Sequence, residues 1–201
     1  MGRRSDARER LLTAADQLFR NRGFLSVGVA ELCSEAGVNK GSFYHFFPSK
    51  RSLLLEVVEA AWDETGMLRQ WEAEPPHRPV DALRSFLEEL FAFHYADQEA
   101  SGRVRGSLLA NLSLELAPQD PEVGDKVNEL LSREIGAFEA LISDALDLGQ
   151  VSLGSPLHAA QALVGSLHGL LMLARARNDL SVLPDSENEL LRLVGVTQPW
   201  L

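Results

Sequence analysis

The sequence contains a single cysteine, Cys33, among its 201 residues. One thiol cannot form an internal disulfide or a zinc site built from several cysteines, so a reducing cytoplasm fits this composition. Cys33 lies within the apolar stripe of a predicted helix. We therefore expect a small, buried packing residue there, rather than a redox sensor.

Uninterrupted apolar segments are also missing. The longest apolar stretch, residues 156–174, is broken by two histidines, a glutamine and a serine, which makes it a poor membrane span. Charged residues, not an apolar run, follow Arg3 and Arg4, so no secretory signal is visible. We expect a soluble cytoplasmic protein with no membrane partner.

Sequence signatures of several enzyme classes are absent as well. The chain has no H-E-x-x-H, no G-x-x-x-x-G-K-[ST] and no G-x-S-x-G. The segment "VGSLHG" lacks the glycine that would have to stand two residues before Ser166. We also find no internal repeat and no low-complexity tract. The sequence therefore predicts no enzyme, no metal site and no cofactor.

Charge is unevenly distributed along the chain. The formal net charge is -10, which alone argues against a nucleic-acid partner. Residues 1–51, however, hold nine Lys or Arg against five Asp or Glu, whereas residues 52–201 hold ten against twenty-four. A basic N-terminal segment followed by an acidic remainder, here called the acidic body (residues 52–201), indicates two functions. An uneven surface charge without function would give the same numbers of charged residues.

Apolar residues recur at helical spacing almost throughout, and no segment favours a strand. The sequence predicts an all-α fold of about nine helices. Their ranges are 6–22, 29–36, 40–46, 50–73, a helix from 79 closed by residues 96–102, 103–116, 121–149, 156–178 and 184–194. Capping signals support these limits. The predicted N-caps are Ser5, Asn39, Ser49, Asp120 and Ser155.

The two short helices at 29–36 and 40–46 have the spacing of a helix-turn-helix, whose second helix enters the DNA major groove. Gly37 suits the tight turn between them. Three apolar side chains can hold the second helix to its neighbours: Val38, Phe43 and Phe47. Five residues are then left facing outward: Lys40, Gly41, Ser42, Tyr44 and His45. A tight helical corner with aromatic packing is the alternative interpretation.

These outward residues suit contact with DNA. Lys40 and His45 can reach base edges or phosphates, while the hydroxyls of Ser42 and Tyr44 suit phosphate oxygens. Gly41 lets the backbone come close. Lys50, at the start of the next helix, is expected on a phosphate. Arg3 and Arg4 precede the first predicted helix and could form an arm along the duplex.

Residues 8–54 resemble the DNA-binding domain of TetR-type, or tetracycline-repressor-like, transcriptional regulators. The matching segments are "ERLLTAADQLFRNRGF", "VAELCSEAGVNKGSFYHFFPSK" and "RSLL". The resemblance implies a helix-turn-helix domain over residues 1–49 and a ligand-binding and dimerisation domain over 50–201. It assigns DNA recognition to Lys40, Gly41, Ser42, Tyr44 and His45, with Lys50 on phosphate. Gly28 and Asn39 depart from the usual capping residues without endangering the fold.

The resemblance further implies a homodimer that binds a double-stranded DNA operator and responds to a small molecule. A repressor released from a palindromic operator is the favoured interpretation. An activator of the same family, or a helical interaction protein that has lost DNA binding, is the alternative.

Two surfaces of the acidic body are expected to serve these tasks. The helix at 156–178 is apolar nearly all round, which favours a dimer interface with the last helix, or else an internal core helix. The predicted interface residues are Leu157, Ala160, Val164, Leu167, Leu171, Leu190, Leu191 and Val194. The candidate pocket residues are Trp62, Met67, Trp71, Phe86, Phe91, His94, Asn111, Glu115, Phe138 and His168. Asn111 and Glu115, four residues apart on an otherwise apolar helix, are the candidate polar anchors, although both could equally face solvent or cap a neighbouring segment.

Overall fold

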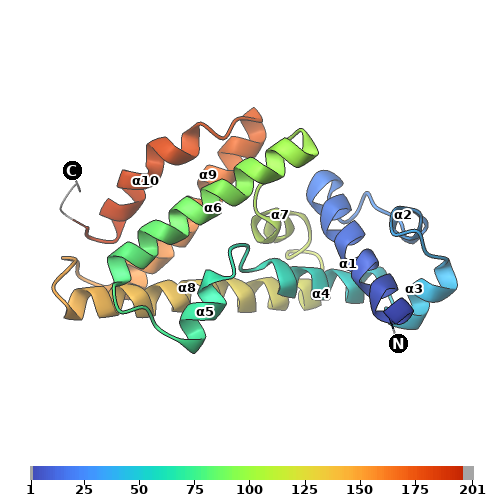
Figure 1. Cartoon of the computed structure of the whole chain (residues 1–201), viewed down its shortest axis with the longest axis horizontal. Coiled ribbons are helices and arrows are strands. Elements are labelled where there is room, and N and C mark those ends of the chain that lie inside the picture. Colours follow the sequence, from blue (N-terminus) through green and yellow to red (C-terminus); the bar gives the residue numbers. More distant parts are fainter. Residues whose placement is uncertain (1, 197–201) are drawn as a thin grey trace. The chain divides into compact units, whose positions relative to one another are not determined.

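The computed structural model describes residues 2–196, and the side chains of residues 6–196. Within this range all regular structure is helical, which confirms the predicted all-α fold (Figure 1). The ten helices of the described range are α1 (Gly2–Arg22), α2 (Val29–Glu35), α3 (Lys40–Phe46), α4 (Lys50–Ala61), α5 (Met67–Ala73), α6 (Pro79–Ser101), α7 (Leu108–Glu115), α8 (Pro121–Asp147), α9 (Pro156–Arg177) and α10 (Val182–Leu193).

Local side-chain chemistry determines where several of these helices begin. Asn39 and Ser155 each accept a hydrogen bond from the backbone N–H three residues further on. Ser49 does the same for α4 and forms a reciprocal capping box with Ser52. Gly37 adopts a φ of 62°, the left-handed conformation expected for the turn before α3. These predicted capping positions are confirmed.

The single helix predicted over residues 50–73 is wrong, because the chain forms two helices, α4 and α5. The buried carboxylate of Asp63 accepts a hydrogen bond from the backbone N–H of Arg69 at 2.8 Å and one from the Thr65 hydroxyl at 3.2 Å. Gly66 takes a φ of 77° immediately before α5. Side-chain capping by Asp63 therefore competes with the continuous helix that apolar spacing alone predicts.

Three other predicted helix starts differ from the structure. α1 begins at Gly2, so Ser5 lies inside the helix and is not its cap. α7 begins at Leu108, not at residue 103, since Gly106 takes a φ of 68°, which a helix cannot include. α10 begins at Val182, two residues before the predicted start.

The chain divides into two compact units. The first unit comprises Met1–Trp62 and Leu108–Glu129, and the second comprises Asp63–Ser107 and Leu130–Leu201. In the first unit, α1 packs on α2, α3 and α4, and α7 packs on α1 and α4. Its core is formed by side chains that are fully buried, including Leu11, Phe19, Leu32, Phe43, Phe47, Leu53 and Leu54.

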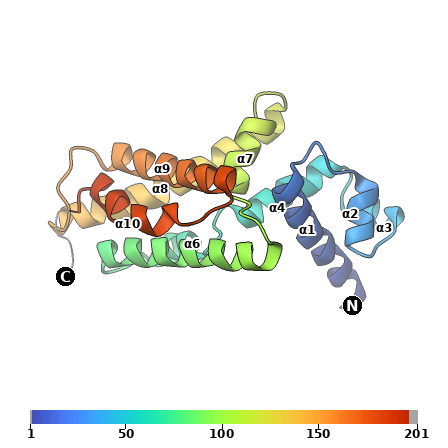
Figure 2. The same cartoon turned by 90° about the horizontal axis from the view of Figure 1, so that it is seen from above.

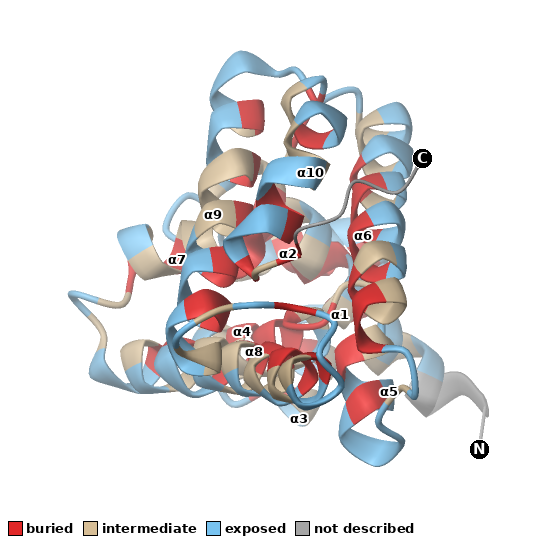
Figure 3. Ribbon diagram, turned by 90° about the vertical axis from the view of Figure 1, so that its left-hand side faces the viewer, coloured by how far each residue is buried: buried red, intermediate tan, exposed pale blue. Residues whose placement is uncertain are grey.

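In the second unit, α10 packs along α9 and also touches α6 (Figure 2). The buried positions of α6 run along one side of that helix (Figure 3). Core side chains here include Leu87, Phe138, Ala160 and Leu163, all with no exposed surface. Among the described helices, α9 alone is long and apolar enough to cross a membrane, but it packs its buried side into this core.

Candidate nucleic-acid interface and effector region

α2 and α3 form a helix-turn-helix within the first unit. Ala36, which ends α2, is buried, and Gly37 then turns the chain toward α3. Phe43 and Phe47 are fully buried with ring centroids 6.0 Å apart, so they hold α3 against the first unit. Val38, expected to be buried as well, is half-buried.

The opposite side of α3 faces outward. Lys40, Gly41, Tyr44 and His45 are exposed, and Ser42 is half-buried. Tyr44 keeps 56% of its surface exposed, although an aromatic ring is normally well buried. A Cβ built on Gly41 would lie 3.2 Å from Oδ1 of the capping Asn39, a tight contact, and close to no other described side chain. The predicted division of α3 into a buried and an exposed face is confirmed.

Lys50 differs from the other predicted DNA-binding residues, because its ammonium group is directed into the first unit. Its Nζ donates hydrogen bonds to the carbonyl oxygens of Phe24 and Val27, both at 2.7 Å. The same nitrogen lies 3.9 Å from the centroid of the Phe24 ring. Burial lowers the pKa of Lys50, with the charge of Glu115 acting in the opposite direction. Lys50 therefore stabilises the turn between α1 and α2, a role the sequence did not predict.

Glu115, predicted as a polar anchor of the ligand pocket, binds the same turn. Its carboxylate oxygens accept hydrogen bonds from the backbone N–H groups of Phe24 at 3.1 Å and Leu25 at 2.8 Å. A Cβ on Gly23 would come within 2.9 Å of one of these oxygens, so the close approach depends on glycine. The pocket assignment of Glu115 is therefore corrected: this side chain caps the backbone that follows α1.

Arg3 and Arg4 were expected in an arm that precedes the first helix. The structure instead places their backbone in the first turn of α1. Their side chains lie outside the part of the chain whose side chains are described. Any contact they make with DNA therefore starts from a helical backbone.

Several predicted pocket residues meet in the second unit. Trp71 of α5, Phe86 of α6 and Phe138 of α8 form an aromatic cluster, with centroid distances of 5.8, 6.1 and 5.0 Å. Phe91 is buried in the same unit, and Met67 is half-buried at the start of α5. Aromatic pairs at these distances add to the stability that burial provides.

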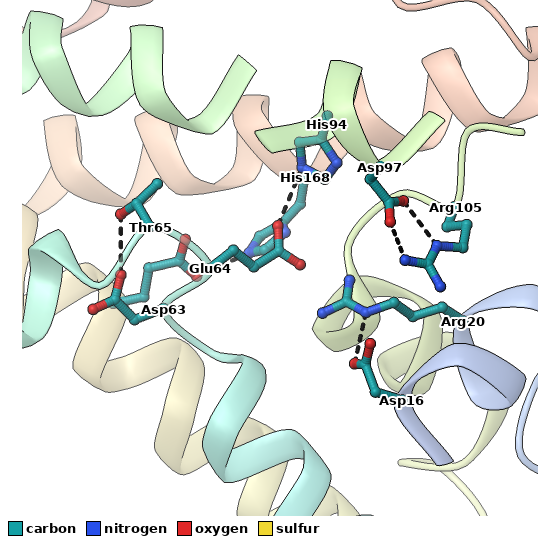
Figure 4. Close-up of polar contacts among 10 residues, drawn as sticks. Asp16, Arg20, Asp63, Glu64, Thr65, His94, Asp97, Arg105 and His168 are labelled. Atoms are coloured by element: carbon teal, nitrogen blue, oxygen red, sulfur yellow. Dashed lines mark hydrogen bonds and ion pairs between the residues drawn. The ribbon is translucent and has the colours of Figure 1, made fainter. Parts of the chain in front are cut away.

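Two histidine–glutamate pairs also lie inside the second unit (Figure 4). His94 Nε2 is 3.2 Å from Glu64 Oε2, and His168 Nε2 is 2.9 Å from Glu134 Oε2. Burial alone would lower the pKa of His168, but the hydrogen bond and charge of Glu134, with Glu64 adding to them, raise it. The side chains described include no group of three or more His, Cys, Asp or Glu suited to a metal ion. The two pairs form a polar region in an otherwise apolar interior.

The remaining pocket candidates, Trp62 and Asn111, belong to the first unit. Trp62 is buried at the C-terminal end of α4, and Asn111 is half-buried on α7. The predicted pocket set is thus divided, with Met67, Trp71, Phe86, Phe91, His94, Phe138 and His168 in the second unit.

The predicted dimer interface needs a larger correction. Seven of its eight residues have 3% or less of their surface exposed within a single chain: Ala160, Val164, Leu167, Leu171, Leu190, Leu191 and Val194. Their apolar stripe is covered by α9, α10 and α6 of the same chain, so these residues form the internal core. Leu157 alone of the set is exposed.

Comparison with known proteins agrees with this geometry. The family described as "Bacterial regulatory proteins, tetR family" matches residues 11–57, which include the helix-turn-helix. The HTH-type transcriptional repressor NemR of Escherichia coli (strain K12) is 31% identical over 168 residues, covering 79% of this chain and 78% of NemR. An uncharacterised HTH-type regulator in the lacX 3′ region of Lactococcus lactis is 26% identical over 194 residues, covering 93% of this chain and 92% of that one.

Solved structures share the fold. The regulatory protein TetR from Rhodobacter sphaeroides superposes with a TM-score of 0.80 at 25% identity, covering 93% of this chain and 98% of the other. The family match lies on the helix-turn-helix, and the similarity to NemR extends over most of both chains. The chain therefore belongs to the TetR family of bacterial transcriptional regulators.

Proposed function

We propose that the protein is a cytoplasmic repressor that binds a palindromic operator as a homodimer and leaves it when a small molecule binds the second unit. The exposed polar face of α3 carries this proposal, because its helix is fixed by Phe43 and Phe47 while Lys40, Tyr44 and His45 stay free to reach DNA. The name of NemR, a repressor, supports the direction of control.

On DNA, α3 lies in the major groove. Lys40 and His45 donate to base edges or phosphates, and the hydroxyls of Ser42 and Tyr44 bind phosphate oxygens. Gly41 allows close approach of the helix backbone to the duplex. Residues 1–49 form the DNA-binding part, which needs the rest of the first unit for its support.

Lys50 and Glu115 position the helix-turn-helix, and neither residue contacts DNA itself. Both bind the backbone of Phe24 in the turn that follows α1. Lys50 donates a hydrogen bond to its carbonyl oxygen, and Glu115 accepts one from its N–H. That turn leads directly into α2. A change at α7 or at the start of α4 would therefore alter the support of the helix-turn-helix.

The dimer forms through the outward faces of α9 and α10. These faces stay available because only the inward faces of the two helices are buried within a single chain. Apolar side chains on these faces are exposed in the single chain: Leu157, Met172, Leu173 and Leu193. A groove of about 570 Å³ runs between the two helices, with Gly169, Leu170 and Leu173 in its lining. A two-fold dimer reads two half-sites at once and so gains the affinity that one short helix lacks.

Charge placed in this groove tests the dimer. Leu173→Arg should convert the dimer to a monomer in light scattering after size exclusion, because it buries an unpaired charge at the interface. Leu148→Arg is the matched control, since Leu148 is also exposed but does not line the groove. A dimer that persists in Leu173→Arg would place the interface elsewhere.

Release from the operator requires an effector that binds the DNA-incompetent conformation more tightly than the competent one. The second unit offers suitable surroundings, with an aromatic cluster for apolar groups and buried histidine–glutamate pairs for polar ones. Binding there lowers the population of dimers in which the spacing of the two helix-turn-helix motifs matches the operator.

Selection of duplexes from a random pool by the full chain tests the function. The recovered DNA should contain an inverted repeat with half-sites about one helical turn apart. His45→Ala should alter which bases are recovered. A variant outside α3, such as Leu148→Arg, should keep the wild-type sequence preference. Recovery of no preferred sequence at low salt would contradict the proposal.

A further inference from the structure

A cleft of about 300 Å³ lies between α5 and α8 of the second unit. Trp71 forms part of it from α5, and Pro75 and Pro76 continue the wall beyond the end of that helix. The other wall is one face of α8, in which Gly136 and Ala140 are exposed. A volume of this size is at the lower end of the range for small-molecule sites.

The middle of the α8 wall is formed by the small residues Gly136, Ala137 and Ala140, with Leu141 beside them. A Cβ built on Gly136 would meet nothing within 4 Å, so the space in front of this glycine is open. From Gly136 to Asp144 the wall extends about 12 Å along the helix, at about 1.5 Å per residue. Trp71, which keeps 8% of its surface exposed, is the aromatic residue of the opposite wall. A planar ring system fits such a slot better than a branched aliphatic group does.

Charge at the two ends of the cleft indicates the ligand's polarity. At one end Arg133 Nη2 lies 3.1 Å from Glu72 Oε2, so the guanidinium already has a counter-charge within the cleft. At the other end Asp144 is exposed, and no described residue forms an ion pair with it. The lining therefore carries one unmatched negative charge.

The surroundings have the same sign. The second unit contains 17 Asp or Glu against nine Lys or Arg, so a cation is attracted to it and an anion is repelled. The carboxylate of Asp144 and the net charge of the second unit thus favour a cationic compound.

We propose that this α5–α8 cleft binds a planar aromatic compound carrying an amine or other cationic group, and that such compounds are the effectors of the regulator. The ring lies between Trp71 and the small-residue face of α8, and the cation lies near Asp144. The effector role rests on the repressor function proposed above, whereas the binding chemistry does not.

Three naphthalene probes that differ in charge test the binding chemistry on the full chain. These are the cationic 1-naphthylmethylamine, the neutral 1-naphthalenemethanol and the anion 1-naphthaleneacetate. Titration calorimetry measures the affinity of each. The amine should bind about fivefold more tightly than the alcohol, the gain expected for one partly exposed charge pair. The acetate should bind most weakly. Equal affinities, or tightest binding of the acetate, would overturn the proposal.

Matched variants locate the probe. Asp144→Asn should remove the preference for the amine over the alcohol, whereas Asp147→Asn, three residues further along the same helix and outside the cleft lining, should retain it. Gly136→Leu should abolish binding of all three probes by filling the slot, and Gly136→Ala should bind the amine. Neither change at Gly136 should lower the melting temperature, because both residues favour helix more than glycine does. Unaltered amine binding by Gly136→Leu would place the site elsewhere.

A second readout separates the effector role from the repressor function. Without probe, polarisation of a labelled duplex selected by the chain reports whether the chain binds DNA at all. With probe, the amine should weaken that complex for the wild type and leave Gly136→Leu unaffected. A complex that forms normally and ignores saturating amine would overturn the effector role, whereas absence of any complex would overturn the repressor function instead.

Discussion

Replacement of Lys50 by methionine separates two roles that a lysine at the start of α4 can have. In the structure its ammonium donates to the carbonyl oxygens of Phe24 and Val27 and lies over the Phe24 ring. Methionine keeps most of the aliphatic stem but removes both hydrogen bonds and the charge. We therefore expect lower folding stability and lower affinity for DNA, because the turn before α2 loses the hydrogen bonds that the Lys50 ammonium donates.

The size of the effect follows from these contacts. Hydrogen bonds from charged donors contribute about 1.5 kcal/mol each at the lower end, and a cation over an aromatic face about 0.5 kcal/mol at a half-exposed site. Lys50→Met should accordingly destabilise the chain by roughly 2–4 kcal/mol. That change corresponds to a fall in melting temperature of roughly 5–15 °C for a chain of this size.

The salt dependence of DNA binding distinguishes this role from a phosphate contact. Each phosphate contact contributes about 0.9 to the slope of log affinity against log salt concentration, and a positioning residue contributes almost nothing. Polarisation titrations between about 50 and 200 mM salt should give Lys50→Met the wild-type slope. Lys40→Met, which removes an exposed lysine of α3, is the control and should lower the slope without lowering the melting temperature. A reduced slope with unchanged melting in Lys50→Met would refute the positioning role.

Three further predictions concern the interior. Phe138→Ala should destabilise the chain by about 3–5 kcal/mol in denaturant unfolding, because a fully buried ring of the aromatic cluster is lost; a loss below 1 kcal/mol on the same scale would mean that the cluster is loosely packed. Since the pKa of His168 is raised in the folded chain, its pairing with Glu134 stabilises fully below the reference value of 6.5 and is lost as the pH rises through the higher folded-state value. Thermal melts from about pH 6 upward should therefore decline more steeply for the wild type than for His168→Gln, and parallel curves would contradict the assignment. Burial raises the pKa of the Cys33 thiol, so iodoacetamide should label it only after denaturation, as mass spectrometry can check.

Features that depend on nearby residues were predictable from the sequence. The apolar period identified the helices, and Asn39, Ser49 and Ser155 cap them as expected because each acts on a backbone group three residues away. The two faces of α3 followed from the spacing of Phe43 and Phe47 in the same way. Local patterns succeeded at these positions, but not at Asp63, whose hydrogen bond to the Arg69 backbone divides the helix predicted over 50–73.

Features that depend on distant partners were not predictable. Glu115 binds a turn about 90 residues earlier in the chain; its position on an apolar helix allowed a pocket, solvent or a neighbouring segment as its partner, and spacing alone could not choose among them. Lys50 reaches back to carbonyls at residues 24 and 27, while its place at a helix start suggested phosphate. The apolar stripe of α9 indicated that something covers the helix, but the period is the same whether α10 of the same chain or a second copy does so.

Salt-dependent binding of the full chain to its selected inverted repeat tests the central claim, that the exposed face of α3 binds DNA. The wild type should bind with a steep negative slope of log affinity against log salt, since several phosphate contacts are made at once. Tyr44→Ala combined with Lys40→Met should flatten that slope and weaken the complex, with melting unchanged. A double variant that binds the repeat with wild-type affinity and slope would contradict the account.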